Sequence, residues 1–178
     1  QNLQSPESYV QQMRLGGTLS FKYTGGPQGE KTSPSGEREA AMTRVGIINV
    51  TGYAGVELAR LLCHHPMVDL VSVTGRSTVG QRLGDVYPHL AGTELTITED
   101  LGTVDLAFSA LDHKASADRL LPLIEQGLPV IDLSADFRLR SPEDYSAWYK
   151  VEHPRPEKLA EAVYGLTELH KDELPQAK

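Results

Sequence analysis

The sequence RVGIINVTGYAG, residues 44–55, carries the strongest structural information in the chain. Its first half is a short apolar run rich in β-branched residues, which is typical of a buried strand. Its second half places Gly52 and Gly55 where apolar residues begin to recur at helical spacing. The stretch therefore predicts a strand at residues 44–48, a glycine-bearing turn and a helix at residues 54–64.

The same alternation continues along the chain after this helix. Apolar runs and helical spacing predict, in order, a strand at 68–74, a short strand at 95–98, a strand at 104–109, a helix at 113–126 and a buried strand at 129–133. Gly127 stands where a helix C-cap is expected. Strands joined through helices pair in parallel, so the predicted class is α/β, a Rossmann-like, doubly wound and mainly parallel sheet.

The length of 178 residues allows one full core and an additional segment. Residues 1–41 are rich in Gln, Gly, Ser, Pro and Lys, and we expect an N-terminal extension, a tag or a poorly ordered tail there. The regular pattern starts after Met42, so we expect the nucleotide-binding domain to occupy residues 42–178.

Composition excludes several classes of function. A net charge of -7, without a basic run beside aromatic residues, argues against a nucleic-acid partner. No stretch reaches the roughly 20 apolar residues that cross a bilayer, which argues against a membrane protein. The single cysteine, Cys63, forms neither an internal disulfide nor a multi-cysteine metal site, which favours a reducing compartment, the cytoplasm. We expect no bound metal.

The glycine turn suggests an anion site. Gly52 and Gly55 carry no Cβ, so the backbone can approach a diphosphate whose charge faces the free N–H groups of the helix start. The three-glycine form of this turn has glycine at the position of Asn49, and asparagine tolerates the left-handed region that the turn requires. The alternative interpretation is a helix start with two packing glycines.

The end of the second strand bears on the choice of dinucleotide. A domain that prefers NAD usually carries Asp or Glu about 20 residues after the turn, at this strand end. This chain has Gly75-Arg76-Ser77-Thr78 instead, and a guanidinium with two hydroxyls suits the 2′-phosphate of NADP. A solvated surface turn is the alternative.

Two further segments follow predicted strands at the same sheet edge. In Ser109 to His113, the histidine is a candidate ligand contact or a helix cap. In Asp132 to Arg138, a carboxylate, a hydroxyl and an arginine either hold one another as an ion-paired loop, which is the interpretation we favour, or address a substrate phosphate.

Four blocks of sequence occur in a characteristic order: TGYAGVEL from Thr51, YPHL from Tyr87, LSADFR from Leu133 and YGL from Tyr164. In identity and spacing these blocks resemble the N-acetyl-γ-glutamyl-phosphate reductase family, from about Val45 to the last residue. The chain departs from the family at two positions. Asn49 stands where the family usually has glycine, and Asp112 stands where the family usually has a proline before the histidine.

The resemblance implies NADP(H) as cofactor. It places phosphates at Thr51, Gly52, Tyr53, Ala54 and Gly55, and the adenosine end at Arg76, Ser77 and Thr78. It implies further cofactor contacts at Ser109, Ala110, Leu111 and His113, with Ser134 near the nicotinamide.

The resemblance also implies an activity: attack of a thiolate on the acyl phosphate of N-acetyl-γ-glutamyl phosphate, then hydride reduction to the semialdehyde, in arginine biosynthesis. The nucleophile is expected in an Asn-Pro-Gly-Cys-Tyr-Pro block just beyond Lys178, within a second, catalytic and dimerisation domain largely missing here, so the fragment alone should be inactive. Cys63 lies in the first predicted helix, where an inert thiol is expected.

The implied partners are a small acyl-phosphate substrate and further copies of the subunit, as a dimer or tetramer. The alternatives are an aminoadipyl- or aspartyl-phosphate reductase and a non-catalytic dinucleotide-binding domain.

Overall fold

The computed structural model describes residues 42–177 of the chain. The expectations for residues 1–41 lie outside the described residues. The described part falls into two compact units, Met42–Ala162 and residues 163–177. No helix within these residues has both the length and the apolar character that crossing a membrane requires.

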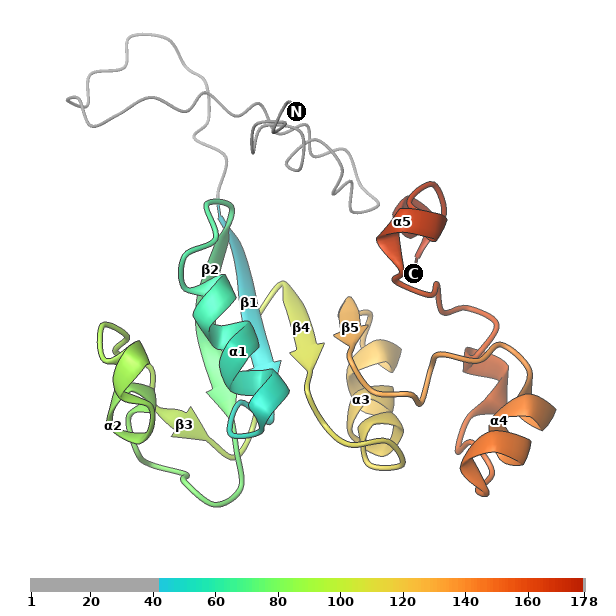
Figure 1. The fold of residues 1–178 in the computed structure, drawn as a ribbon, viewed down its shortest axis with the longest axis horizontal. Helices are drawn as coiled ribbons and strands as arrows, with labels where there is room; N and C mark the ends of the chain where they lie inside the picture. Colours follow the sequence, from blue (N-terminus) through green and yellow to red (C-terminus); the bar gives the residue numbers. More distant parts are fainter. Residues whose placement is uncertain (1–41, 178) are drawn as a thin grey trace, which may run out of the picture. The chain divides into compact units, whose positions relative to one another are not determined.

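The first unit is built on a five-stranded, all-parallel sheet (Figure 1). Its strands are β1 (Thr43–Ile48), β2 (Val68–Thr74), β3 (Ile97–Thr98), β4 (Leu106–Ser109) and β5 (Val130–Asp132). They lie in the order β3-β2-β1-β4-β5, with every neighbouring pair parallel. The predicted Rossmann-like α/β class is confirmed, and the predicted second strand matches β2 at both ends.

Helices connect the strands and extend beyond them. The helices are α1 (Tyr53–Leu62), α2 (Leu83–Val86), α3 (Ser116–Glu125) and α4 (Pro142–Tyr149), with α5 (Thr167–His170) in the second unit. Short 3₁₀ turns lie at Pro88–Leu90, Pro156–Lys158 and Leu174–Gln176. Because the sheet order reverses at β1, right-handed crossovers place α1 and α3 on opposite faces of the sheet.

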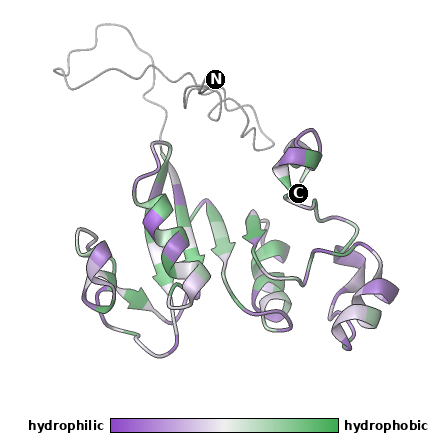
Figure 2. Cartoon of the chain, viewed as in Figure 1, coloured by the Kyte–Doolittle hydropathy of each residue, from purple (hydrophilic) through white to green (hydrophobic). Residues whose placement is uncertain are grey.

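The core lies between the sheet and the helices that cover it. Figure 2 shows the strands as mainly hydrophobic, and the buried cluster includes Val45 and Ile47 of β1, Val73 of β2 and Ala59 and Leu62 of α1. Burying this apolar surface is the main driving force for folding. Both elements that flank the glycine turn, β1 and α1, therefore contribute to this core.

The start of α3 differs from expectation, whereas its C-terminal cap agrees with it. The helix begins at Ser116, three residues later than predicted, because Lys114 has a left-handed backbone (φ 73°) that an α-helix cannot include. At the other end Gly127 has φ 82°, which confirms the expected C-cap.

The prediction of a buried fifth strand is wrong. Among the strands of the described residues, β5 lies at the edge of the sheet and pairs with β4 alone. Ile131 is 40 % exposed and the residues on either side of it are half-buried. An apolar run does not distinguish an edge strand from a central one, because the pattern reflects potential for burial and not the neighbours that provide it.

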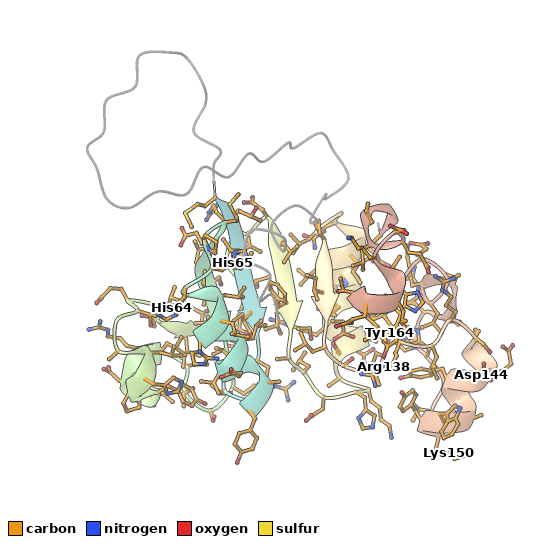
Figure 3. All side chains as sticks on the ribbon, turned by 45° about the horizontal axis from the view of Figure 1, so that its top comes forward. His64, His65, Arg138, Asp144, Lys150 and Tyr164 are labelled. Atoms are coloured by element: carbon orange, nitrogen blue, oxygen red, sulfur yellow. The ribbon has the colours of Figure 1, made fainter. Side chains whose placement is uncertain are left out.

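Helix α4 is not anticipated by the sequence pattern, since Tyr145 is its single buried residue. Its start nevertheless follows local rules: Ser141 Oγ accepts the Asp144 N–H at 3.0 Å, and Pro142 occupies the first helical position. Lys150, with φ 59°, ends it (Figure 3).

Candidate functional site: the carboxyl edge of the sheet

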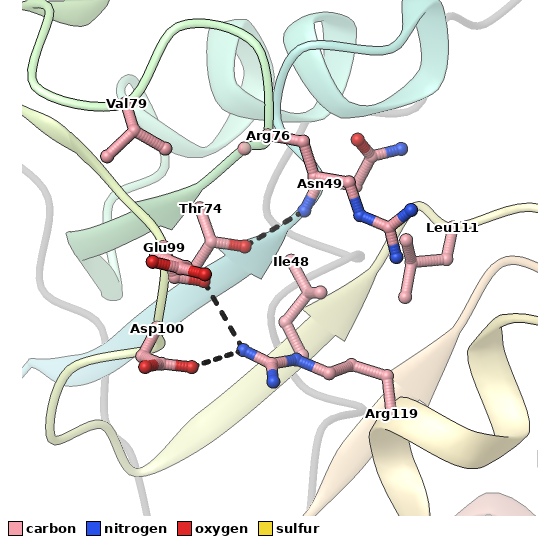
Figure 4. A pocket seen from close by; sticks show the side chains of 10 residues that line it. Ile48, Asn49, Thr74, Arg76, Val79, Glu99, Asp100, Leu111 and Arg119 are labelled. Carbon is pink, nitrogen blue, oxygen red and sulfur yellow. Dashed lines mark hydrogen bonds and ion pairs between the residues drawn. The ribbon is translucent and has the colours of Figure 1, made fainter.

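The carboxyl ends of β1, β2 and β4 meet at one edge of the sheet. Because β2 and β4 flank β1 on opposite sides, this edge is the point at which the strand order reverses, where open α/β folds bind ligands. A pocket of about 490 Å³ opens there (Figure 4). Its lining includes Asn49, Arg76, Glu99, Asp100, Leu111 and Arg119.

Asn49 makes the bend between β1 and the glycine turn. Its φ of 66° lies in the left-handed region, which asparagine adopts more readily than most residues. Its Nδ2 donates to the Ala110 carbonyl at 2.9 Å, and its backbone N–H donates to Thr74 Oγ1 at 3.2 Å. The expectation that asparagine preserves the turn is confirmed. Its amide also ties the turn to the end of β4, which a glycine could not do.

The two glycines of the turn have different structural roles. A Cβ on Gly55 would lie 2.3 Å from the Asn49 carbonyl oxygen and 2.8 Å from Val50 Cα, so α1 packs on the turn only without a side chain there. Gly52 has an ordinary extended conformation (φ −81°), and a Cβ on it would meet its nearest neighbour, Asn49 Nδ2, at 3.4 Å. Packing among residues 42–177 therefore accounts for the glycine at position 55 but not for the one at position 52.

The first turn of α1 presents unpaired donors. Its N-cap is Gly52, which has no side chain to accept from them, and the first helical bond runs from the Val56 N–H to the Gly52 carbonyl at 2.9 Å. The N–H groups of residues 53–55 have no acceptor in the described part of the chain. The Tyr87 hydroxyl donates to the Thr51 carbonyl, in the same turn, at 2.8 Å. Fixed, unpaired N–H groups at a helix N-terminus carry partial positive charge and bind anions.

The residues after β2 supply a cation and hydroxyl groups. Arg76 and Ser77 are exposed, and Arg76 lines the pocket. Within residues 42–177, the Arg76 guanidinium has no hydrogen-bond or ion-pair partner. Thr78 Oγ1 is buried and also lacks a partner. A buried hydroxyl without a partner is uncommon in folded proteins.

The sequence pattern does not predict three charged residues that line the pocket. Glu99 and Asp100 follow β3, and Arg119 lies in the second turn of α3. Arg119 Nη2 donates to Asp100 Oδ1 at 2.7 Å and to the Glu99 carbonyl at 3.3 Å. No local motif marks them, because the fold brings together segments about 20 residues apart.

The segment after β4 contributes mainly through its backbone and one apolar side chain. Ser109 is fully buried, with its Oγ 2.8 Å from Ser116 Oγ. Ala110 accepts from Asn49, and Leu111 lines the pocket. His113 is exposed, and its ring centroid lies 5.9 Å from that of Tyr149. It does not cap α3, whose N-cap is Ala115 without a side-chain bond.

The segment at and after the end of β5, residues 132–138, has a structural role, and we call it the brace. Asp136 is fully buried, and its two carboxylate oxygens accept the N–H groups of Lys114, at 2.8 Å, and Ala117, at 2.9 Å. The Tyr145 hydroxyl donates to the same carboxylate at 2.9 Å. Arg138 donates to the Ser134 carbonyl at 3.3 Å. The carboxylate therefore caps α3 from outside the helix, in place of the expected pairing with arginine.

A second carboxylate continues this brace. Asp132 Oδ1 accepts from Ser116 Oγ at 2.7 Å and from the Ser134 N–H at 3.0 Å. Asp132 Oδ2 accepts from Ser134 Oγ at 2.6 Å. The Ser134 hydroxyl in turn accepts the Asp136 N–H at 3.0 Å. Polar groups at the ends of β4, β5 and α3 are thus linked in one network.

Two groups in the described residues have a perturbed pKa that bears on the chemistry. Burial and the hydrogen bond to the Asp136 carboxylate raise the pKa of Tyr145 well above its usual value of 10.0. Burial also raises the pKa of the Cys63 thiol, which sits at the C-cap of α1. A raised pKa reduces the thiolate fraction, which agrees with the expected inert thiol.

The blocks that motivated the family resemblance are divided between the two units. The glycine turn, the Tyr87–Leu90 block and the Leu133–Arg138 block lie within residues 42–162. The Tyr164–Leu166 block lies in the second unit, where Tyr164 and His170 have ring centroids 5.8 Å apart.

Known proteins resemble this chain over most of the described residues. An N-acetyl-gamma-glutamyl-phosphate reductase from Dehalococcoides mccartyi is 57 % identical over 136 residues, covering 76 % of this chain and 40 % of the relative. A putative [LysW]-L-2-aminoadipate/[LysW]-L-glutamate phosphate reductase from Cenarchaeum symbiosum is 43 % identical over 141 residues, with the same two coverages, 76 % and 40 %.

A solved structure of aspartate semialdehyde dehydrogenase with NADP from Candida albicans aligns with a TM-score of 0.49 at 19 % identity, over 64 % of this chain and 41 % of that one. The chain spans about 40 % of the length of the curated relatives it matches. Residues 44–177 match the family described as semialdehyde dehydrogenase, NAD binding domain. The chain therefore belongs to this family of nicotinamide-dinucleotide-binding domains.

Proposed function

We propose that this chain is the NADP(H)-binding part of an N-acetyl-γ-glutamyl-phosphate reductase. The observation that carries the proposal is the turn between β1 and α1. There no contact among the described residues requires glycine at position 52, and three backbone N–H groups have no acceptor in the same part of the chain. A diphosphate on the turn would use both features.

The remaining residues of the edge fit a dinucleotide. In this proposal Thr51 to Gly55 hold the diphosphate through backbone N–H groups. Arg76, which lines the pocket, holds the 2′-phosphate of the adenosine together with Ser77 and Thr78, which follow it in the chain. The end of β2 carries no carboxylate that would instead favour the 2′-hydroxyl of NAD.

The residues after β4 and β5 take positioning roles in the proposal. Leu111 supplies an apolar surface in the pocket, and Ser109 and Ala110 hold the loop against Asn49 and α3. His113 is exposed and free to contact the cofactor, whereas Ser134 is held in place by Asp132. When bound, the reduced nicotinamide supplies the hydride of the reduction.

The proposed overall reaction reduces an acyl phosphate to an aldehyde and releases phosphate. The 57 % identity to a reductase of that name supports N-acetyl-γ-glutamyl phosphate as the substrate. The Cys63 thiol is not proposed as the nucleophile, because burial raises its pKa and it lies at the C-terminus of α1, away from the glycine turn. We propose that the thiolate, the substrate contacts and the subunit interface of a homo-oligomer belong to other parts of the protein.

A second substrate is favoured by one specific observation. The Cenarchaeum symbiosum relative, 43 % identical, is named for an aminoadipate or glutamate carried on LysW. Both candidate substrates are acyl phosphates, so the cofactor edge serves either one. Rates of NADPH oxidation by the protein that contains this chain, with each acyl phosphate in turn, separate the two.

Calorimetric titration of the chain with NADPH and NADH tests the cofactor assignment. We expect tighter binding of NADPH, and we expect Arg76→Ala to weaken NADPH binding about ten- to a hundredfold with little change for NADH, since a charge-assisted contact to phosphate contributes roughly 1.5–3 kcal/mol. Arg60→Ala is the matched control, because Arg60 is an exposed arginine of α1 paired with Glu57. Equal affinities for the two dinucleotides in the unmodified chain would contradict the proposal.

A further inference from the structure

Two arginines and two carboxylates share the pocket at the carboxyl edge. Arg76 comes from the end of β2 and Arg119 from α3, while Glu99 and Asp100 follow β3 (Figure 4). The formal charges of these four side chains cancel. A pocket of this kind attracts a phosphate only if its positive charges are exposed to the ligand and its negative charges are compensated.

The two arginines differ in how they are engaged. Arg119 donates to Asp100 Oδ1 at 2.7 Å and to the Glu99 carbonyl at 3.3 Å. Its positive charge is therefore directed at the segment that follows β3. The Arg76 guanidinium has no partner within the described residues. One arginine is thus occupied by protein acceptors, and the other is available.

We propose that Arg119 sets the preference for a 2′-phosphorylated dinucleotide by neutralising Asp100, so that Arg76 can act on the phosphate without competition. This inference rests on the function proposed above. Arg119 acts through Asp100 and makes no contact with the ligand. Without Arg119, the single charge of Arg76 faces both Glu99 and Asp100, and the pocket carries a net negative charge.

The effect should depend on the charge of the ligand. The 2′-phosphate of NADPH carries up to two negative charges that the 2′-hydroxyl of NADH lacks. An uncompensated carboxylate in the same pocket therefore disfavours NADPH and leaves NADH nearly unaffected. Because Asp100 is 82 % exposed and solvent screens its charge, we expect a change of about three- to tenfold in the ratio of the two dissociation constants.

Calorimetric titration of the full chain with NADPH and NADH provides the test. Arg119→Met should raise the dissociation constant of NADPH about three- to tenfold and change that of NADH less than about twofold, with the larger effect at low ionic strength. Arg119→Lys should retain the preference, because it keeps the charge. Unchanged NADH binding also shows that the variant is folded.

The double variant Asp100→Asn/Arg119→Met identifies the mechanism. If Arg119 acts by compensating Asp100, removal of both charges restores the preference for NADPH. If the preference stays lost, Arg119 contacts the phosphate directly and the proposal is overturned. An unchanged ratio in Arg119→Met alone also overturns it.

A closely matched ion pair elsewhere in the fold serves as control. Arg82 and Glu94 lie 2.6 Å apart with exposures of 47 % and 85 %, against 2.7 Å, 45 % and 82 % for Arg119 and Asp100. Neither control residue lines the pocket. Arg82→Met should leave the ratio unchanged. Absence of binding of both dinucleotides to the unmodified chain would contradict the proposed function itself, which separates that outcome from failure of the role given to Arg119.

Discussion

The N-termini of α1 and α3 both lie at the carboxyl edge of the sheet, yet they satisfy their backbone donors differently. At α3, the buried Asp136 carboxylate accepts the N–H groups of Lys114 and Ala117, and the Asp112 carbonyl accepts that of Ser116. At α1, the N-cap is Gly52 and the first N–H groups have no acceptor in the described residues. Free donors cost stability unless water or a ligand pairs with them. Within the described residues, the chain therefore pairs the donors at the start of α3 and leaves those at the start of α1 unpaired, which is where we propose that an anion binds.

The largest expected effect comes from breaking the closed helix start. Asp136→Ala removes the acceptor of two backbone N–H groups and one hydroxyl, and we expect it to lower the free energy of unfolding by about 3–5 kcal/mol. Urea denaturation followed by circular dichroism measures the change.

Two variants calibrate this result. Asp118→Ala removes an exposed carboxylate from the first turn of the same helix and should cost at most about 1 kcal/mol. Tyr145→Phe removes one of the three donors and should cost about 1 kcal/mol. If Asp136→Ala proves no more destabilising than Asp118→Ala, the buried carboxylate does not brace the edge.

Substitution of each glycine at the start of α1 should separate effects on stability from effects on NADPH binding. Gly55→Ala places a Cβ against the Asn49 carbonyl oxygen and the Val50 backbone, and we expect it to lower the free energy of unfolding by about 1–3 kcal/mol. Gly52→Ala meets no close neighbour, so we expect a stability near that of the original chain. In the proposed complex its methyl group obstructs the diphosphate, and we expect NADPH binding to weaken about tenfold.

Thermal denaturation and calorimetric titration of the two variants together check the division of roles. Each glycine variant serves as the control for the other, since both add one methyl group to the same turn. A Gly52→Ala protein that binds NADPH as tightly as the original chain would show that the turn does not hold the diphosphate.

The smallest expected effect is a pH dependence of the stability that the Tyr145–Asp136 hydrogen bond provides. The pKa of Tyr145 is raised in the folded chain, so the folded state holds this proton at pH values where the unfolded chain has released it. The contribution is therefore fully present below pH 10 and decreases as pH rises above it, with a limiting slope of about 1.4 kcal/mol per pH unit. Tyr145→Phe should remove this part of the slope. Parallel stability curves for the two proteins between pH 9 and 11, measured in urea, would be incompatible with the expectation.

The sequence by itself determined the strand and helix alternation and the position of the glycine turn. Local patterns carry this information because burial repeats at the period of each element, and because Asn49 and Gly55 reflect backbone requirements of their own position. The match of the predicted strand at residues 68–74 to β2 is an example.

Only the tertiary structure decided the roles of the side chains. Asp136 reaches Lys114, 22 residues earlier in the chain, and Arg119 reaches Asp100 across the pocket, with no motif to indicate either pairing. The edge position of β5 and the exposure of Ile131 were likewise not visible in an apolar run. Pairings of this kind depend on which surfaces the fold brings into contact, and the residues that form them are constrained by distant partners and not by their neighbours in sequence.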